Sequence, residues 1–435
     1  MQDTQVSSTH SQKPSPWLWI PSLYYAEGLP YIVVMAVSVI MYKKLGISNT
    51  DIALYTSLLY LPWVIKPLWS PFVDILKTKK WWIIAMQAML AVGFVGVALS
   101  LQSPTFFIAT LGFLWLAAIS SATHDIAADG FYMIALRDDQ QAFFVGIRST
   151  FYRLAMMSGE GFLVIVAGSL ESSTGDIPLA WSVAFGLLAV MMIVFSVYHQ
   201  FMLPRAKDDQ AAKQAEENIL ATFTQTVVSF FTKYELRPTI IMLLFLLFYR
   251  FGEGQLVKIA APFLLDGHEV GGLGLSTEEV GWINGTIGML ALVIGGILGG
   301  FAVSQKGLKY WIWWMLIAIN LPNAVYVYLA YTQPESLLVI GGAIAIEKFG
   351  YGFGFTAYML YMIYIAQGTF KTAHFAFATG IMALGMMIPG AVSGWIQEQI
   401  GYQHFFVWVL LATIPGFIIT AFLQIDPGFG KKKNG

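Results

Sequence analysis

Long apolar stretches follow one another along almost the whole chain, and short polar turns separate them. An α-helix needs about 20 apolar residues to cross ~30 Å of hydrocarbon. Twelve stretches come near this length, so the pattern predicts an all-α membrane protein with twelve transmembrane helices. These segments, numbered 1 to 12 in chain order, are about 17–41, 51–73, 81–101, 105–134, 142–169, 179–202, 239–265, 278–303, 310–331, 335–366, 374–397 and 403–424.

Landmarks of the first half of the chain return roughly 226 to 230 residues later. The run Tyr24-Tyr25-Ala26-Glu27-Gly28 returns as Arg250-Phe251-Gly252-Glu253-Gly254, and Leu45-Gly46-Ile47-Ser48 returns as Leu273-Gly274-Leu275-Ser276. Ser48 with Asp51 and Ser276 with Glu279 form capping boxes, which predict the starts of segments 2 and 8. A duplicated half of six segments is typical of secondary transporters, whose substrate site lies between the halves near the bilayer midplane.

The repeat predicts a 6+6 pseudo-symmetric domain organisation. We expect residues 1–202 and 239–435 to form two six-helix bundles, joined by a cytoplasmic linker at 203–238. Within the linker, a polar part at 207–218 precedes apolar positions at helical spacing. This pattern indicates an amphipathic helix at the membrane surface.

Composition agrees with a membrane protein. Hydrophobic residues make up 57% of the 435 residues, charged residues 11%, and the mean hydropathy is +0.67, whereas a soluble domain has about 25% charged residues. A net charge of −1 gives no indication of a nucleic-acid partner. The absence of cysteine excludes disulfides, thiolate metal sites and cysteine nucleophiles. With no phosphate-binding loop in the sequence, we expect no cofactor and the proton gradient as energy source.

Lysine and arginine outside the segments are distributed unequally between the two sides. If the N-terminus is cytoplasmic, 17 of these basic residues lie on the cytoplasmic side of the membrane. Two of them, Lys43 and Lys44, lie on the opposite side. Because basic residues concentrate in cytoplasmic loops, we expect both termini in the cytoplasm. The 17 are Lys13, Lys77, Lys79, Lys80, Arg137, Arg148, Arg205, Lys207, Lys213, Lys233, Arg237, Lys306, Lys309, Lys371, Lys431, Lys432 and Lys433.

Charged residues inside the segments point to the functional site, because each costs at least ~2.5–3.5 kcal/mol in the bilayer. Segments 1, 4, 7 and 10 carry most of them, and segments 3, 6, 9 and 12 carry none in their interiors. We therefore expect the first set to line a wet cavity and the second to face lipid. The predicted substrate and proton cavity contains Glu27, Tyr24, Tyr25, His124, Asp125, Asp129, Arg153, Glu160, Arg250, Glu253, Lys258, Glu347 and Lys348.

Some of these charges also suit a structural role. Asp125 and Asp129 lie four residues apart on one helical face, and Arg153 on the next segment is a candidate partner for either, as a static or gating ion pair. Lys66 and Asp74, eight residues apart at the cytoplasmic end of segment 2, are each interpreted as a structural or gating residue.

Three carboxyl groups near mid-membrane are candidates for proton coupling: Glu27, Glu253 and Glu347. Burial disfavours the charged form of a carboxyl group, so each of them can carry a proton. Fixed ion pairs are the alternative. Because Glu27 and Glu253 are equivalent in the repeat, we expect them to face each other across the cavity.

Several motifs resemble those of a known family. Ser70-Pro71-Phe72-Val73-Asp74, followed by Lys77, Lys79 and Lys80, resembles the loop 2–3 signature of the major facilitator superfamily, with Ser70 at the usual place of glycine. Other motifs are similar to those of its AmpG-type muropeptide permeases. They are Gly28-Leu29-Pro30, Ala122-Thr123-His124-Asp125, Tyr152-Arg153-Leu154, Tyr249-Arg250 with Gly252-Glu253, and Pro389-Gly390 with Gly394-Trp395.

The resemblance covers nearly all of 18–420. It implies the major facilitator fold and proton-driven uptake of anhydro-sugar muropeptides across a bacterial inner membrane, and we expect a functional monomer. Glu27 stands where these permeases tend to have a small residue, and His124 replaces their usual glutamine. A more acidic cavity is compatible with a more cationic substrate or an extra proton site.

Three alternatives remain at this point. A siderophore or acyl-CoA-type substrate is the alternative within the same group. A membrane-embedded enzyme would use an exposed His124 with Asp125 or Asp129, and it leaves the duplication unexplained. A non-transporting sensor usually appends a soluble output domain, which the sequence does not show. The sequence therefore favours a transporter that is not an enzyme.

Overall fold

The computed structural model of the protein describes residues 14–205, 209, 219–368 and 371–431. Every regular element in these ranges is helical. The first half contains α1 (Pro16–Ile32), α2 (Ser38–Lys44), α3 (Asn49–Leu58), α4 (Leu61–Leu76), α5 (Lys79–Ser100), α6 (Phe106–Ala135), α7 (Asp138–Met157), α8 (Val164–Thr174) and α9 (Ile177–Met202). After α10 (Ile219–Thr232) come α11 (Leu236–Phe248), α12 (Phe251–Leu265), α13 (Thr277–Val280), α14 (Met289–Lys306), α15 (Leu308–Asn320), α16 (Ala324–Thr332), α17 (Leu337–Ala366), α18 (Lys371–Leu411) and α19 (Ile414–Thr420).

All twelve predicted segments lie on helices, and ten helices among the described residues are long and apolar enough to cross a membrane. Segment 2 is not among the ten because α3 and α4 are interrupted at Leu59 and Tyr60. Segments 11 and 12 count as one because α18 runs through both. Gly401 has φ 72° and ψ 167°, so two helices meet at this glycine.

Both predicted capping boxes have a serine cap. Ser48 Oγ accepts a hydrogen bond from the N–H of Asp51 (3.0 Å), and Ser276 Oγ accepts one from the N–H of Glu279 (3.2 Å). Glu279 completes its box by accepting the N–H of Ser276 (2.8 Å). The helices that begin segments 2 and 8 therefore start where the sequence predicts, because the serine oxygen satisfies an otherwise unpaired N–H.

Three short π-helical turns interrupt the long helices: Val33–Val37 between α1 and α2, Ser158–Leu163 between α7 and α8, and Gly281–Gly288 between α13 and α14. The second and third belong to different halves of the chain and pack against each other. Such turns often occur at functional sites, because they displace side chains from regular helical positions.

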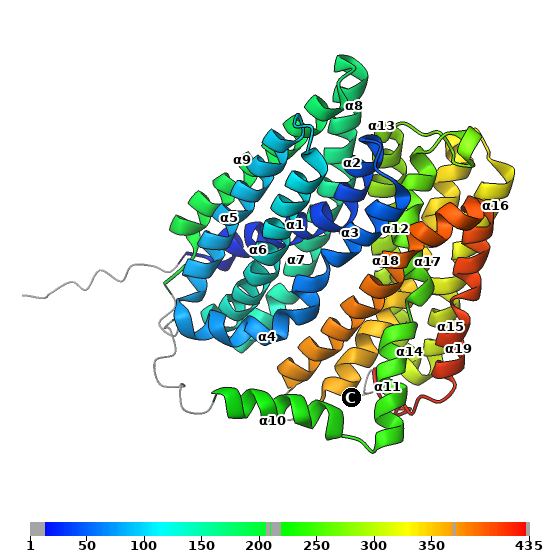
Figure 1. Ribbon diagram of the computed structural model, residues 1–435. Helices are drawn as coiled ribbons and strands as arrows, with labels where there is room; N and C mark the ends of the chain where they lie inside the picture. Colours follow the sequence, from blue (N-terminus) through cyan, green and yellow to red (C-terminus); the bar gives the residue numbers. More distant parts are fainter. Residues whose placement is uncertain (1–13, 206–208, 210–218, 369–370, 432–435) are drawn as a thin grey trace, which may run out of the picture.

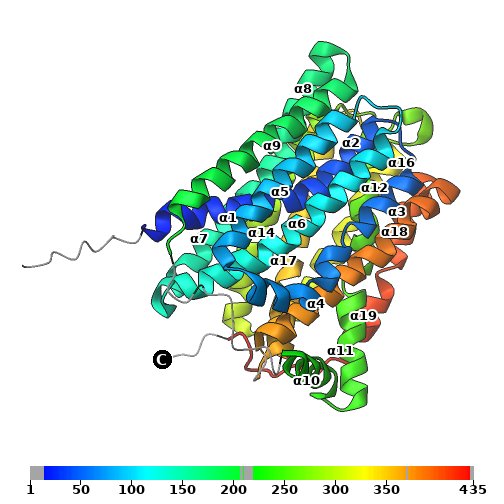
Figure 2. The ribbon, with the colours of Figure 1, turned by 60° about the vertical axis from the view of Figure 1, so that its left-hand side comes forward.

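Helices α1 to α9 form one half of the molecule and α11 to α19 the other (Figure 1). Helix α10 lies across one end, which we call the linker side (Figures 1 and 2). The opposite end, where α8 ends and α13 begins, is the far side. Large apolar side chains are exposed along α9 at helical spacing, as expected for a lipid-facing helix. They are Leu179, Val183, Leu187, Val190, Ile193, Val194, Val197 and Phe201.

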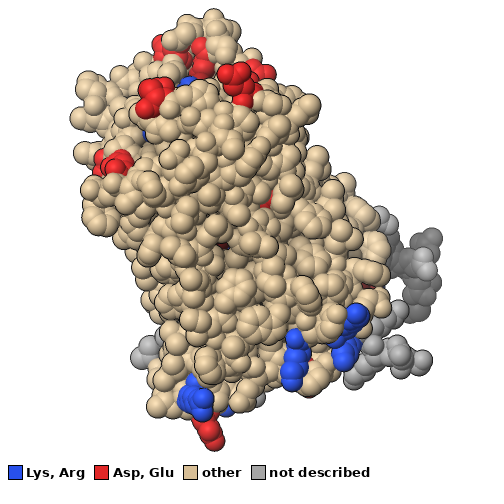
Figure 3. Space-filling view, turned by 90° about the vertical axis from the view of Figure 1, so that its right-hand side faces the viewer, with Lys and Arg blue, Asp and Glu red and all other residues tan. Residues whose placement is uncertain are grey.

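Charged side chains gather at the two ends of the molecule on the face seen in Figure 3. Lysine and arginine lie mainly at the linker side, acidic residues mainly at the far side, and the band between them is largely uncharged. This distribution is typical of a protein whose middle band contacts hydrocarbon.

The described part of the linker contacts both halves. Asp209 accepts hydrogen bonds from the N–H groups of Lys79 and Lys80 (2.6 and 3.1 Å) at the start of α5. Lys233 donates to the carbonyl oxygens of Ile365 (2.8 Å) and Gln367 at the end of α17, and burial lowers the pKa of this lysine. The predicted amphipathic helix corresponds to α10, whereas most of the polar stretch at 207–218 lies outside the described residues.

Close backbone contact joins the two halves at two glycines. A Cβ atom at Gly394 of α18 would lie 1.9 Å from the carbonyl oxygen of Asn49. A Cβ atom at Gly285 would lie 2.1 Å from the carbonyl oxygen of Glu160, where the second and third π-helical turns meet. Both positions require glycine, because any side chain would separate the backbones.

Polar contacts hold the halves together on the far side. Lys43 forms an ion pair with Asp266 (2.7 Å). Glu398 of α18 accepts hydrogen bonds from the backbone N–H and the hydroxyl of Thr50 (3.0 and 2.6 Å), so it caps the start of α3 from the opposite half. Thr277 donates to Glu171 (2.6 Å) between α13 and α8. The molecule is therefore closed on the far side.

We predict that replacing Gly285→Val forces the halves apart at the far side. Overpacking costs ~1–3 kcal/mol, which shifts a two-state equilibrium by about tenfold to a hundredfold. Spin labels on cysteines placed at Ser173 and Glu269, one in each half, should report a longer distance in this variant.

Gly300→Val is the matched control, because a Cβ atom at Gly300 meets nothing within 4 Å. It should leave the distance distribution unchanged. Equal distributions in the Gly285→Val variant and the unmodified protein would contradict the role of this contact.

Candidate functional site

The first half holds a cluster of buried and partly buried charges, defined as Glu27 of α1, Lys66 of α4, Asp125 and Asp129 of α6, and Arg148 of α7. Lys66 forms an ion pair with Asp125, and Arg148 forms one with Asp129 (2.6 Å). These pairs connect α4 and α7 to α6. We call this set the N-terminal cluster.

Tyrosines of the first half differ in their relation to this cluster. Tyr24 donates a hydrogen bond to Asp129 (3.1 Å), and the guanidinium of Arg148 lies 4.3 Å from the Tyr24 ring centre. Tyr25 instead packs its ring against Phe195 of α9 (5.9 Å between ring centres). The two tyrosines have different neighbours because adjacent residues point about 100° apart around a helix, and a cavity position for either one stays a prediction.

Glu27 is the acid of the N-terminal cluster without an ion pair among the described residues. Its side chain is buried, one carboxyl oxygen has no hydrogen-bond partner among the described residues, and its carboxyl group lies within electrostatic reach of Asp125 and Asp129. Acids that lie this near one another repel when all of them are ionised. The cluster has three acids and two cations, so this arrangement suits one bound proton.

The predicted pairing of Arg153 with Asp125 or Asp129 is wrong. Arg148 forms the ion pair with Asp129, because five residues advance about 140° around a helix and place the two arginines on different faces. Arg153 lies against Gly296 of α14 in the other half, with a guanidinium nitrogen 3.2 Å from the glycine's Cβ position. Lys66 forms an ion pair with Asp125, and the side chain of Asp74 lies outside the described residues.

The second cluster joins both halves and is called the C-terminal cluster: Glu160, Glu253, Asn284, Glu347 and Lys348. Glu347 and Lys348 of α17 form an ion pair (3.6 Å), and Asn284 donates a hydrogen bond to Glu160 across the contact between the halves. Lys348 also lies within electrostatic reach of Glu160 and Glu253. Three acids therefore share this lysine.

Unpaired polar atoms surround the C-terminal cluster. Glu253 and Glu347 are each 1% exposed, and each has a carboxyl oxygen without a hydrogen-bond partner among the described residues. The hydroxyl of Tyr326 and the amide of Asn323 are also buried without such a partner. Buried polar groups are normally paired, and exceptions concentrate at functional sites.

Arg250 stands at the break between α11 and α12. It donates a hydrogen bond to the hydroxyl of Tyr351 (2.6 Å), and its guanidinium lies 5.0 and 4.9 Å from the ring centres of Tyr351 and Phe355. No acidic side chain forms an ion pair with it in the described part of the chain.

Lys258 lies in the contact between the halves, which differs from its predicted position in the cavity. The ammonium group is buried, and it donates to Thr56 (3.0 Å) and to the carbonyl oxygen of Met35 (3.4 Å), both in the other half. The ring of Tyr60 lies 5.2 Å away. Lys258 therefore binds the first half in this closed arrangement.

His124 belongs to a buried hydrogen-bond network. Gln87 bridges His124 (2.9 Å) and His199 (3.0 Å), and His199 contacts the hydroxyl of Ser22 (3.0 Å). His124 is 1% exposed. The enzyme hypothesis requires an exposed histidine, so this geometry does not favour it.

Sequence patterns missed several residues of these sites. Arg148 was counted with the basic residues of the cytoplasmic side although it falls within segment 5 (142–169), and Asn284 had no predicted role. Gln87 and His199 were also missed, although a polar residue in an otherwise apolar segment is a usable signal. The repeat-equivalent acids Glu27 and Glu253 are both buried, each in the cluster of its own half, and their facing across a cavity stays a prediction.

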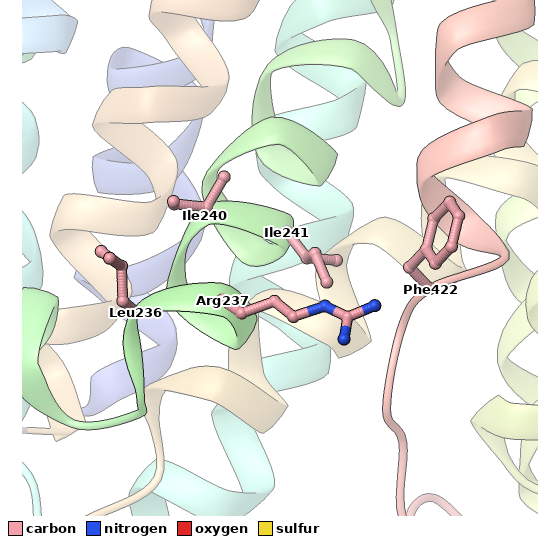
Figure 4. Close-up of a pocket in the computed structure, with 5 residues that line it drawn as sticks. All are labelled: Leu236, Arg237, Ile240, Ile241 and Phe422. Atoms are coloured by element: carbon pink, nitrogen blue, oxygen red, sulfur yellow. The ribbon is translucent and has the colours of Figure 1, made fainter.

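A surface groove of about 430 Å³ lies between α11 and α19, away from both clusters. Figure 4 shows its lining: Leu236, Arg237, Ile240, Ile241 and Phe422. Arg237 is the charged residue of this lining. The groove lacks the convergent polar groups that orient a polar ligand.

Similar solved structures have the same fold as this chain. A D-xylose-proton symporter aligns over 94% of this chain and 97% of its own, with a TM-score of 0.71 and 10% identity. The nucleoside transporter NupG aligns over 94% and 99%, with a TM-score of 0.70 and 13% identity. A bacterial homologue of the lysosomal transporter Spinster, in an inward-facing and unoccupied conformation, has a TM-score of 0.66 and 15% identity over 93% and 96%.

Sequence relatives cover almost the whole chain. The Anhydromuropeptide permease of Escherichia coli (strain K12) is 25% identical over 418 residues, which are 91% of this chain and 77% of the permease. Putative transporter AmpG 4 of Rickettsia conorii is 24% identical over 92% of this chain and 94% of its own. The Major Facilitator Superfamily matches residues 26–393. This transporter chain, built from two helical halves with charge clusters in the interior, belongs to the Major Facilitator Superfamily.

Proposed function

We propose that this protein takes up an anhydro-muropeptide, or a similar polar organic solute, by proton-coupled transport. The observation that supports this substrate is the similarity, over 91% of the chain, to a protein named Anhydromuropeptide permease. The names of these relatives do not favour the alternative, a siderophore or acyl-CoA-type solute. The solute is a small molecule, and the protein acts as a carrier in the membrane and not as an enzyme.

Proton coupling is supported by the acids of the two clusters. Glu27, Glu253 and Glu347 are buried, and each has a carboxyl oxygen without a hydrogen-bond partner among the described residues. Glu160 of the first half belongs to the cluster of Glu253 and Glu347, so a relative movement of the halves changes the electrostatic surroundings of these two acids. Such a change can load and release a proton, and no other cofactor is needed.

The proposed movement is a rocking of residues 1–202 against 239–435 about the contact on the far side. We infer from the distribution of lysine and arginine that the linker side is cytoplasmic, with both termini inside a bacterial inner membrane. Closure of the far side then corresponds to an inward-facing state. The unit of transport is a monomer, because all of the clusters come from one chain.

Purified protein in liposomes tests the proposed function. Under an inward proton gradient, it should accumulate a radiolabelled anhydro-muropeptide, and a protonophore should abolish the accumulation. A ferric siderophore and acetyl-CoA serve as competitors of the other proposed classes. If either of these inhibits uptake of the labelled solute at a lower concentration than unlabelled muropeptide does, the substrate belongs to that other class.

We predict that replacing the coupling acid by its amide abolishes uphill uptake and leaves exchange between equal pools largely intact. The variants are Glu27→Gln, Glu253→Gln and Glu347→Gln. An amide cannot carry the proton, yet it keeps the size and most hydrogen bonds of the acid. The measurement compares gradient-driven uptake with exchange in the same liposomes.

Folded yield is the control for this series, because loss of a fixed ion pair would lower it. If all three variants express normally and still concentrate the solute under a pH gradient, coupling does not run through these acids.

We also predict that the linker side is inaccessible from outside the cell. Single cysteines at Lys79, Lys233 and Lys431 in this cysteine-free chain should resist an impermeant thiol reagent added to intact cells. A cysteine at Glu269, on the far side, should react. Ready labelling at the first three positions would reverse the proposed orientation.

A further inference from the structure

Two arginines from opposite halves lie close to one tyrosine. Arg250 of the second half is hydrogen-bonded to the hydroxyl of Tyr351 (2.6 Å). Arg153 of the first half lies against α14 and within electrostatic reach of the same tyrosine. Neither guanidinium has an ion pair with an acid among the described residues. Glu253 lies within electrostatic reach of Arg250, but the acid and the guanidinium do not form an ion pair.

Arg250 differs from the other buried cations in this respect. Lys66, Arg148 and Lys348 each form an ion pair with an acid. Lys258 also lacks an acid, but an amine can lose its proton. A guanidinium stays charged in proteins, so burial of Arg250, which is 8% exposed with Nε unpaired, is costly unless an anion compensates it.

The backbone around Arg250 also favours an anion. Helix α11 ends at Phe248 and α12, of 15 residues, begins at Phe251, so the positive end of α12 lies beside Arg250. Broken helices of transporters direct such ends at anionic parts of the substrate. Glu253 lies in the first turn of the same helix. An anion at Arg250 and an ionised Glu253 repel each other, so binding of the anion and of a proton is linked.

Aromatic rings complete the surroundings. Tyr351 and Phe355 of α17 lie under the guanidinium of Arg250. Tyr31 and Tyr60 of the other half lie within electrostatic reach of Arg250. Rings of this kind pack against the flat or apolar parts of a solute, while the guanidinium binds a planar carboxylate with two parallel hydrogen bonds.

We propose that Arg250, assisted by Arg153 of the opposite half, binds a carboxylate of the transported solute. This inference rests on the proposed function, since the peptide part of an anhydro-muropeptide carries free carboxylates. Arg250 is then a determinant of specificity for the peptide part of the solute, and the acids of the clusters remain free for the proton. Because the two arginines come from different halves, a solute carboxylate bound by both of them connects the halves.

Binding to purified full-length protein tests the proposal. The probes are a radiolabelled anhydro-muropeptide with free peptide carboxylates and the same molecule with those carboxylates converted to amides. The unmodified protein should bind the free form at least about tenfold more tightly, because a hydrogen bond to a charged group is strong when buried.

Arg250→Met should weaken binding of the free form by about tenfold to a hundredfold and that of the amidated form by less than about threefold. Arg153→Met should act in the same direction. The affinity of Arg250→Lys for the free form should lie between those of the unmodified protein and Arg250→Met, because lysine keeps the charge but cannot donate two parallel hydrogen bonds. Arg237→Met, which removes an exposed arginine in the groove of Figure 4, is the matched control and should change neither affinity.

Each other outcome is decisive. Equal binding of both probes by the unmodified protein overturns the inference and leaves the proposed function standing. Failure to bind and transport either probe overturns the proposed function, and the inference with it. If Arg250→Met does not yield folded protein, Arg250→Lys and Arg153→Met carry the test. An unchanged preference for the free form in both of these then overturns the inference.

Discussion

A charge inside hydrocarbon must be neutralised or hydrated, and much of this structure depends on that constraint. The ion pairs Lys66–Asp125 and Arg148–Asp129 connect α4 and α7 to α6. In the second half, Lys348 forms an ion pair with Glu347 and lies within electrostatic reach of Glu253. Glu27, Arg250 and Glu253 form no ion pair among the described residues, and all three are buried. Local charge balance therefore contributes to which helices are connected in the interior.

The contact between the halves also depends on the lipid that surrounds the protein. Lipid supplies no hydrophobic force that drives apolar helices together, so association relies on close packing and polar bonds. Gly285 and Gly394 permit backbone contact, and Glu398 adds a helix cap from the opposite half. Contacts of this kind can separate without unfolding either half, because each half keeps its own helices when the contact opens. They suit a transporter that must open and close on one side.

The two halves share a fold, but the side chains at equivalent positions differ in identity or in surroundings. Glu27 and Glu253 occupy equivalent positions of the repeat, yet Glu27 lies beside another carboxyl group and Glu253 beside Lys348. The place that holds Tyr24 in the first half holds Arg250 in the second. The two halves thus differ in the charges that they place at equivalent positions of the repeat.

The sequence by itself determined the helical fold, the start of the helices at Ser48 and Ser276, and which acids are buried. Those features depend on the length of apolar stretches, on local capping and on the rarity of charge in a membrane. Only the tertiary structure decided that Arg148 replaces Arg153 as the partner of Asp129, and that Lys258 binds the opposite half. Pairing depends on the rotation and depth of each helix relative to its neighbours, and the periodicity of a single helix contains no information about either.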